Sequence, residues 1–228
     1  MKHLNCLITG ASSGIGKEIA IELSYFVKHI YISARNVKKL EHVHDKVIKN
    51  SECTIVPLNL CEENGIEELA RNIFKKDKCL DILVLSAGII NQLSPVESIE
   101  LKKLNEIINL NYISNFRMLK NFHPLLKSSS NSNIALISSI KDSSKDYYWG
   151  IYQPIMTALN ELFTTYAKEN RSTNIRTNIF CPKAVNTSLR DVIMPGENKN
   201  NISDARSVAK KIVSHIFSKA KSGIIEIN

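Results

Sequence analysis

The chain has 228 residues, of which 43% are hydrophobic and 23% are charged, and these proportions are typical of an ordinary globular protein. This length suits one large domain with a sizeable core and leaves little room for a second domain. The formal net charge is +8, but the lysines are scattered among acidic residues and no basic stripe with interleaved aromatic residues occurs, so we expect no nucleic-acid partner.

Short apolar runs alternate with longer segments of helical spacing along the chain. Seven runs are expected to form strands: Leu4–Thr9, His29–Ala34, Thr54–Leu58, Asp81–Ser86, Asn133–Ser138, Ile175–Phe180 and Gly223–Ile227. Six amphipathic segments are expected to form helices: Gly16–Phe26, Val37–Lys49, Glu62–Lys76, Leu101–Leu126, Gly150–Glu169 and Asp204–Ser218. This alternation predicts a single doubly wound α/β domain of the Rossmann type over residues 1–228, with a seven-stranded parallel sheet and helices on both faces.

One further segment, residues 186–201, has no periodic pattern and contains Pro195 and Gly196. It is long for a passive connection between a strand and a helix. We therefore expect an irregular, mobile lid over a binding site.

The first expected strand runs into a helix through the glycine-rich turn Thr-Gly-Ala-Ser-Ser-Gly-Ile-Gly at residues 9–16. Glycines let the backbone turn sharply and approach a pyrophosphate, whose charge the exposed N–H groups and the helix dipole then bind. The position between the first strand and the first helix is the context that such a motif requires. The turn therefore predicts a dinucleotide-binding site.

The spacing of this turn resembles the fingerprint Thr-Gly-x-x-x-Gly-Ile-Gly of the short-chain dehydrogenase/reductase family. Other landmarks of that family follow in order along nearly the whole chain. Residues 86–88 resemble the family's Asn-Ala-Gly element, Asn59 stands where an Asp usually lies beside the adenine, and residues 182–187 resemble Pro-Gly-x-Val-x-Thr with Lys183 in place of glycine. The resemblance implies these cofactor contacts: Gly10, Ser12, Ser13, Gly14, Ile15, Gly16, Asn59, Leu60, Ala87, Gly88, Tyr152, Pro182, Val185 and Thr187.

The end of the second expected strand bears on the choice of cofactor. A protein of this architecture that uses NAD(H) needs an acidic side chain there to hold the ribose 2′-hydroxyl. Residues 33–36 are Ser-Ala-Arg-Asn, with no carboxylate. The guanidinium of Arg35 is shaped to hold a 2′-phosphate with two hydrogen bonds. We therefore predict NADP(H), the alternative for Arg35 being a solvated surface arginine.

The family resemblance also implies four catalytic positions: an Asn, a Ser, a Tyr and a Lys four residues after the Tyr. Asn111 matches the first, inside the long helix expected over Leu101–Leu126. Ser139 matches the second, at the end of the fifth expected strand, and Tyr152 follows at the family's usual interval. The fourth position is Met156, so the lysine is missing.

The missing lysine bears directly on mechanism. Carbonyl reduction needs a proton donor, and a phenol can serve, but the pKa of free tyrosine is near 10. In the family the lysine supplies a positive field, whereas a thioether carries no charge and donates no hydrogen bond. Losing about 3–4 kcal/mol of transition-state stabilisation slows a step roughly 10² to 10³-fold. Lys141, Lys145 and Lys183 are candidates for a substitute cation, and Lys183 is alternatively a solvated side chain.

Two functions remain open. The first is an NADP(H)-dependent oxidoreductase acting on a small carbonyl or alcohol substrate, in which Ser139 orients the carbonyl and Tyr152 donates the proton. By family resemblance, Asn111 would support a water chain. The alternative is a catalytically impaired nucleotide-binding homologue that acts as a sensor or assembly partner. The departures from the family pattern that support the alternative are Met156, Lys183, Asn59 and Ser86.

The remaining features bear on location and partners. Five cysteines form no C-x-x-C pair, which favours a reducing compartment. No signal-peptide pattern and no apolar stretch of membrane-spanning length occur, so we expect a cytoplasmic protein without a membrane partner. His42 and His44 lack further ligands at suitable spacing, so no metal site is expected. The family resemblance implies a homodimer or homotetramer.

Overall fold

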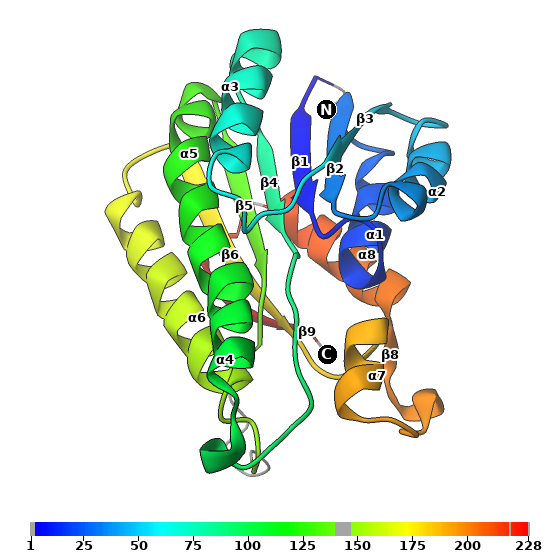
Figure 1. Ribbon diagram of the computed structural model, residues 1–228. Helices are drawn as coiled ribbons and strands as arrows, with labels where there is room; N and C mark the ends of the chain where they lie inside the picture. The colour runs from blue at the N-terminus through cyan, green and yellow to red at the C-terminus, as the bar shows by residue number, and fades with distance from the viewer. Residues whose placement is uncertain (1–2, 140–146, 219, 228) are drawn as a thin grey trace.

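The computed structural model describes residues 3–139, 147–218 and 220–227. Its main sheet is parallel throughout, with the strand order β3-β2-β1-β4-β5-β6-β9 (Figure 1). The strands are β1 (Asn5–Thr9), β2 (His29–Ala34), β3 (Glu52–Pro57), β4 (Ile82–Leu85), β5 (Ser132–Ile137), β6 (Ile175–Pro182) and β9 (Gly223–Ile227). The predicted doubly wound α/β fold with a seven-stranded parallel sheet is confirmed.

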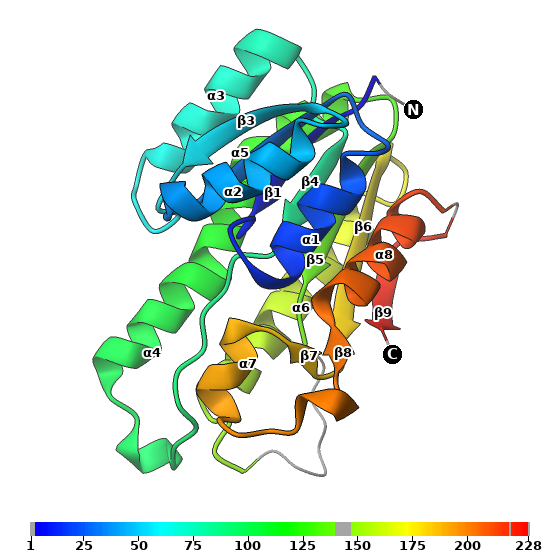
Figure 2. The ribbon, with the colours of Figure 1, turned by 90° about the vertical axis from the view of Figure 1, so that its right-hand side faces the viewer.

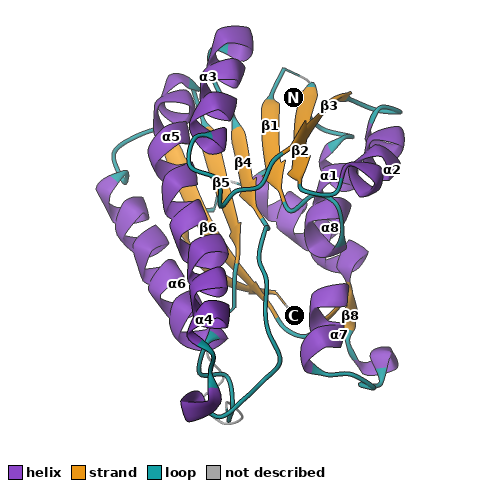
Figure 3. Ribbon diagram, in the orientation of Figure 1, coloured by secondary structure: helices purple, strands orange, loops and turns teal. Residues whose placement is uncertain are grey.

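Helices cover both faces of this sheet (Figure 3). The α-helices are α1 (Gly14–Leu23), α2 (Val37–Val47), α3 (Gly65–Asp77), α4 (Leu101–Ile107), α5 (Ser114–Ser128), α6 (Tyr152–Glu169), α7 (Ser188–Ile193) and α8 (Ala205–Ile216). The core cluster on one face contains Leu23, Val43 and Ile212 from α1, α2 and α8. The cluster on the other face contains residues of α3, α5 and α6, among them Phe122 and Phe163. Strands that are apolar at nearly every position fit burial on both sides.

The helix expected over Leu101–Leu126 is interrupted in the structure. Between α4 and α5 the backbone forms a π-helical turn, η2, over Ile108–Ile113. Ser114 compensates for part of the disturbed helical bonding, because its Oγ donates a hydrogen bond to the Leu110 carbonyl oxygen at 2.6 Å. Such a turn inserts an extra residue that side-chain periodicity does not reveal, and π-turns are frequent at functional sites.

The segment expected to be irregular, residues 186–201, contains the short helix α7 and the 3₁₀ turn η3 (Lys199–Asn201), so the expected lack of regular structure is wrong, whereas its expected mobility stays a prediction. Thr187 begins the helix, since its Oγ1 accepts a hydrogen bond from the Arg190 N–H at 3.3 Å. β7 (Val185–Asn186) pairs with β8 (Ser203–Asp204), which brings together the two ends of the segment that contains α7 and η3. Figure 2 shows α7 beyond the carboxyl ends of the main strands.

No α-helix in residues 3–139, 147–218 and 220–227 is both long enough and apolar enough to cross a membrane.

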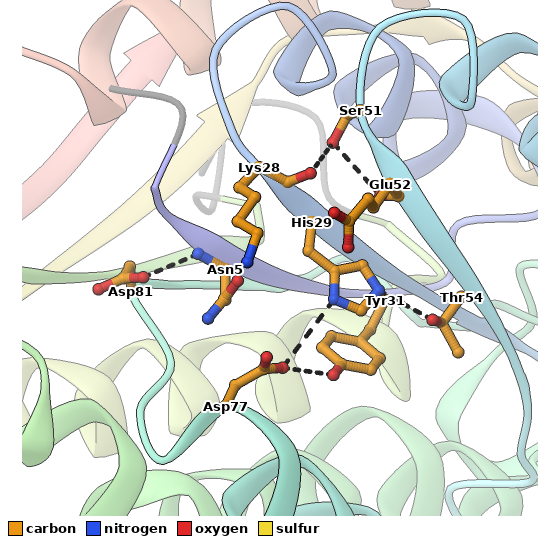
Figure 4. Close-up of polar contacts among 9 residues, drawn as sticks. All are labelled: Asn5, Lys28, His29, Tyr31, Ser51, Glu52, Thr54, Asp77 and Asp81. Carbon is orange, nitrogen blue, oxygen red and sulfur yellow. Dashed lines mark hydrogen bonds and ion pairs between the residues drawn. The ribbon is translucent and has the colours of Figure 1, made fainter.

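A buried polar cluster ties β2 to β3 and α3 at the edge of the sheet where the strands begin (Figure 4). His29 Nε2 lies 2.8 Å from Thr54 Oγ1, and His29 Nδ1 lies 4.0 Å from Asp77 Oδ2. The Tyr31 hydroxyl donates a hydrogen bond to the same carboxylate oxygen. Burial and the nearby Lys76 ammonium lower the pKa of His29, although Asp77 acts in the opposite direction. The folded chain therefore resists protonation of this ring.

We predict that the free energy of unfolding falls as the pH is lowered from about 7 to 5, because the unfolded chain binds a proton near the ordinary histidine pKa of about 6.5 and folded His29 does not. The His29→Gln variant should lose part of this dependence in urea titrations. Burial also lowers the pKa of His215. The His215→Gln variant is therefore measured beside His29→Gln, and it should likewise lose part of the pH dependence. An unchanged pH dependence in His29→Gln would contradict the prediction.

Candidate active site

A cavity of about 1290 Å³ lies at the carboxyl edge of the sheet, where open α/β sheets bind their ligands. Its volume exceeds the roughly 300–1,000 Å³ typical of pockets for one small ligand, so it has room for a large cofactor and a second molecule. The predicted site residues that line it are Gly10, Ser12, Ser13, Gly14, Ile15, Arg35, Asn59, Leu60, Ala87, Gly88, Asn111, Ser139, Tyr152, Pro182, Val185 and Thr187. Only the predicted contact Gly16 is absent from the lining, and it lies buried behind the turn.

The glycine-rich turn is shaped by the close approach of its own backbone to the turn after β4. Gly10 has a φ of +68°, and a Cβ there would lie 2.7 Å from the Ser86 backbone. A Cβ on Gly16 would lie 2.5 Å from the Gly10 carbonyl oxygen. The first turn of α1 has no side-chain cap and no acidic residue. Its free N–H groups and positive dipole end therefore fit the pyrophosphate of a dinucleotide.

Two cations line the end of the cavity next to β2. Arg35 follows the strand as predicted, and Lys39 joins it from the first turn of α2. Asn36 caps this helix, since its Oδ1 accepts a hydrogen bond from the Lys39 N–H at 3.0 Å. Lys39 was not predicted from the sequence, although it lies only four residues after Arg35. Glu226 is the single carboxylate among the described lining residues, and it lies on the distant strand β9.

The predicted catalytic side chains come from three different elements. Ser139 follows β5, Tyr152 is the first residue of α6, and Asn111 lies in the π-helical turn η2. Burial raises the pKa of the Tyr152 phenol to about 12, and the nearby Ser139 hydroxyl offsets this only in part. Ser139 Oγ makes no hydrogen bond of normal geometry to any described residue. It is therefore available to donate to a substrate oxygen.

Met156 lies one helical turn after Tyr152 and is buried, with 4% of its surface exposed. Its sulfur is 4.0 Å from Asn111 Nδ2. The same amide is held by the Ile89 backbone, since Oδ1 accepts from the Ile89 N–H at 2.9 Å and Nδ2 donates to the Ile89 carbonyl oxygen at 2.8 Å. A neutral thioether thus fills the space beside Asn111, and the amide that was expected to support a water chain is held by backbone groups.

The structure shows no cation acting on Tyr152 among the residues it describes. The side chains that affect the pKa of the phenol are Ser139 and Cys181, and neither carries a positive charge. Lys183 lines the cavity with an exposed side chain but does not contribute. The other two substitutes considered from the sequence, Lys141 and Lys145, lie outside the described residues.

One residue that positions this site was missed in the sequence. Asn160, on α6, bonds both residues at the end of β5: it accepts from Ser138 Oγ at 2.5 Å and donates to the Ser139 carbonyl oxygen at 2.9 Å. It lies eight residues after Tyr152, about two helical turns along the same face. The spacing of Asn160 from Tyr152 was visible in the sequence. Its contact with the end of β5 was not, because no sequence pattern indicates which side chain a strand end contacts.

The fold and the site together define a Rossmann-type α/β protein with a serine and a tyrosine in the cavity at the carboxyl edge of its sheet. The sequence profile of the short chain dehydrogenases matches residues 5–198. The chain therefore belongs to the short-chain dehydrogenase/reductase family, which is a family of oxidoreductases.

Individual relatives agree with this assignment. A tropinone reductase homologue from Arabidopsis thaliana is 29% identical over 211 residues, which cover 91% of this chain and 79% of the relative. A short chain dehydrogenase from Pseudomonas syringae superposes with a TM-score of 0.91 at 25% identity, covering 99% of this chain and 94% of the other. A short chain dehydrogenase from Shigella flexneri, solved in complex with NADP, gives a TM-score of 0.89 at 21% identity, covering 99% and 97%.

We predict that Gly10→Ala lowers the free energy of unfolding by roughly 2–5 kcal/mol, because left-handed strain of about 1–2 kcal/mol adds to overpacking of about 1–3 kcal/mol. Gly196→Ala is the matched control, since Gly196 has a φ of +84° but no atom within 4 Å of its Cβ position. Chemical denaturation measures both. Equal losses in the two variants would show that the approach to Ser86 is not what requires glycine.

Proposed function

We propose that the chain is an NADP(H)-dependent oxidoreductase that transfers hydride between the nicotinamide and a small carbonyl or alcohol substrate. The observation that carries this proposal is one continuous cavity that joins an uncapped helix start, the Arg35–Lys39 pair and the Ser139–Tyr152 pair. The NADP complex of the Shigella flexneri protein supports the choice of cofactor, as does an alcohol dehydrogenase from Thermococcus sibiricus solved with 5-hydroxy-NADP.

The described residues fit such a cofactor. The α1 N–H groups would hold the pyrophosphate, and Arg35 with Lys39 would hold the 2′-phosphate, because no described carboxylate lines the cavity at the carboxyl end of β2. Thr187, whose side chain lies 3.3 Å from the Cβ position of Gly14, would close over the phosphates. When bound, the cofactor supplies or accepts the hydride. Ser139 then orients the substrate oxygen by a hydrogen bond, and Tyr152 exchanges a proton with it.

The pKa of Tyr152 bears on the direction of reaction. At pH 7 a phenol with a pKa of about 12 is almost entirely protonated, and roughly one in 10⁵ molecules carries the phenolate. The protonated form is the one needed to donate to the oxygen of a carbonyl under reduction. Alcohol oxidation needs the phenolate as base. The raised pKa therefore keeps Tyr152 in the form from which reduction starts at neutral pH and leaves little of the phenolate that alcohol oxidation would need.

A second candidate function is favoured by Met156. Without a cation, no positive charge stabilises the negative charge that develops on the Tyr152 oxygen in the transition state. A loss of about 3–4 kcal/mol of this stabilisation would slow the reaction roughly 10² to 10³-fold. A chain that binds the dinucleotide but turns over negligibly would be a nucleotide-binding homologue that acts as a sensor or assembly partner. Restoring the cation distinguishes this candidate from a slow reductase.

The cofactor assignment predicts that Arg35→Ala weakens NADPH binding roughly 10- to 100-fold, because a hydrogen bond to a charged group contributes about 1.5–3 kcal/mol. NADH affinity should not change. Isothermal titration calorimetry measures both, and Lys38→Ala is the matched control, since Lys38 is an exposed neighbour that does not line the cavity. Wild-type protein that binds NADH as tightly as NADPH would refute the assignment.

The catalytic assignment predicts that Met156→Lys speeds NADPH-dependent reduction about 10² to 10³-fold, whereas Met156→Leu changes little. In the wild type, the rate of alcohol oxidation should rise about tenfold per pH unit from pH 7 to 10, because the phenolate is the base. In Met156→Lys the rise should level off at lower pH, since an ammonium lowers the pKa of Tyr152.

The outcomes separate the two candidates. Measurable reduction by the wild type over ketones and aldehydes supports the slow reductase. An inert wild type with an active Met156→Lys variant supports the nucleotide-binding homologue. If both are inert while calorimetry shows bound NADPH and an intact fold, the assignment of Ser139 and Tyr152 as a hydride-transfer site is wrong.

A further inference from the structure

The cavity also reaches α7, whose residues line it together with Ser139 and Tyr152. The cofactor contacts implied by the family motif end at Thr187, but the lining continues along α7 as far as Met194. The described apolar residues of this end are Ile90, Trp149, Leu189, Val192, Ile193 and Met194. A lining of this kind suits an apolar ligand with a few polar groups to orient it.

Two of these apolar side chains are exposed although they face the cavity. Val192 is 44% exposed and Met194 is 36% exposed, and both belong to the lining. Isolated exposed apolar residues are common on protein surfaces. Here, however, they adjoin Ile193 in one wall of a cavity that also contains Ser139 and Tyr152. A ligand whose carbonyl reaches those hydroxyls would therefore cover them.

The wall carries little charge, although Arg190 lies in it. Glu197 binds this guanidinium with two hydrogen bonds, of 2.8 Å from Nε and 2.7 Å from Nη2. Next to this pair, Lys199 Nζ lies 2.9 Å from Asp191 Oδ1. Both pairs join α7 to the segment that follows it. The arginine is thus already occupied by a carboxylate and does not offer the cavity an unpaired positive charge.

An aromatic residue, Trp149, also lines the cavity, beside Tyr152. The ring of Trp149 lies 6.0 Å from the ring of Tyr152, centre to centre. Trp149 is the single tryptophan of the chain, so its fluorescence reports on this end of the cavity alone.

We propose that the substrate is an apolar carbonyl compound whose hydrocarbon part packs between α7 and Trp149, and that Val192 and Met194 determine its selectivity. This inference rests on the proposed function for the place of the carbonyl, beside Ser139 and Tyr152. Each methylene buried against this wall strengthens binding about fourfold.

Titration of the NADP⁺-saturated protein with unbranched 2-alkanones, from butanone to decanone, tests the proposal through the fluorescence of Trp149. We expect affinity to rise about three- to fourfold per methylene until the wall is covered. Met194→Ser and Val192→Ser should weaken decanone about tenfold and leave butanone nearly unchanged. Ile48→Ser is the matched control, because Ile48 is 49% exposed at the end of α2 and does not line the cavity.

A ketone of the same length that ends in a carboxylate tests the alternative that the exposed Lys183 selects the substrate. Tighter binding of this ketone than of its methyl ester, or affinities that do not change with chain length, would overturn the proposal. The readout does not depend on turnover. Ketones that bind with the expected length dependence but are never reduced would refute the proposed hydride transfer and support the apolar site. Turnover without length dependence would refute the apolar site and support the proposed hydride transfer.

Discussion

The site depends on the contact between two turns at the carboxyl edge of the sheet. Gly10 follows β1 in a left-handed conformation, and its missing Cβ lets the backbone pack on Ser86 after β4. Thr9 Oγ1 joins the same turns, because it accepts hydrogen bonds from the N–H groups of Ser86 and Ala87 at 3.3 and 3.4 Å. This contact directs the uncapped start of α1 into the cavity, so that the pyrophosphate proposed to bind there would be held by backbone N–H groups.

The core next to Tyr152 is apolar, in contrast to these polar turns. Met156 belongs to the same core cluster as Leu119 and Leu159, so the position that holds a lysine in the family motif is packed as core here. Burying a thioether avoids the cost of desolvating an ammonium, and the fold loses nothing by it. The proposed proton transfer would bear the cost instead, because the Tyr152 phenol is buried without a compensating charge. Fold stability and proton transfer therefore place opposite demands on this residue.

The sequence was most informative where one local pattern determines the structure. Wholly apolar runs and a glycine-rich turn predicted the parallel sheet and the start of α1, since burial on both faces and positive φ leave few alternatives. It was least informative where the structure depends on contacts between distant residues. The π-helical turn at Asn111, the Asn160 bonds to the end of β5 and the pairing of Arg190 with Glu197 leave no periodic signal. Lys39 lies between these cases, because its closeness to Arg35 in the sequence was visible but its orientation toward the cavity was not.

Burial of the Tyr152 phenol has two opposite effects on the proposed chemistry. Excluding water from the phenol disfavours the phenolate, but it also strengthens every hydrogen bond that a neutral donor makes there. In the proposed mechanism, without the family lysine and with Arg190 occupied by Glu197, polarisation of a substrate oxygen would fall to neutral hydroxyl donors, which act best where the dielectric is low. A charged substrate would lose its hydration without gaining an opposite charge from the α7 wall, whereas the proposed apolar ketone would itself exclude water from Ser139 and Tyr152.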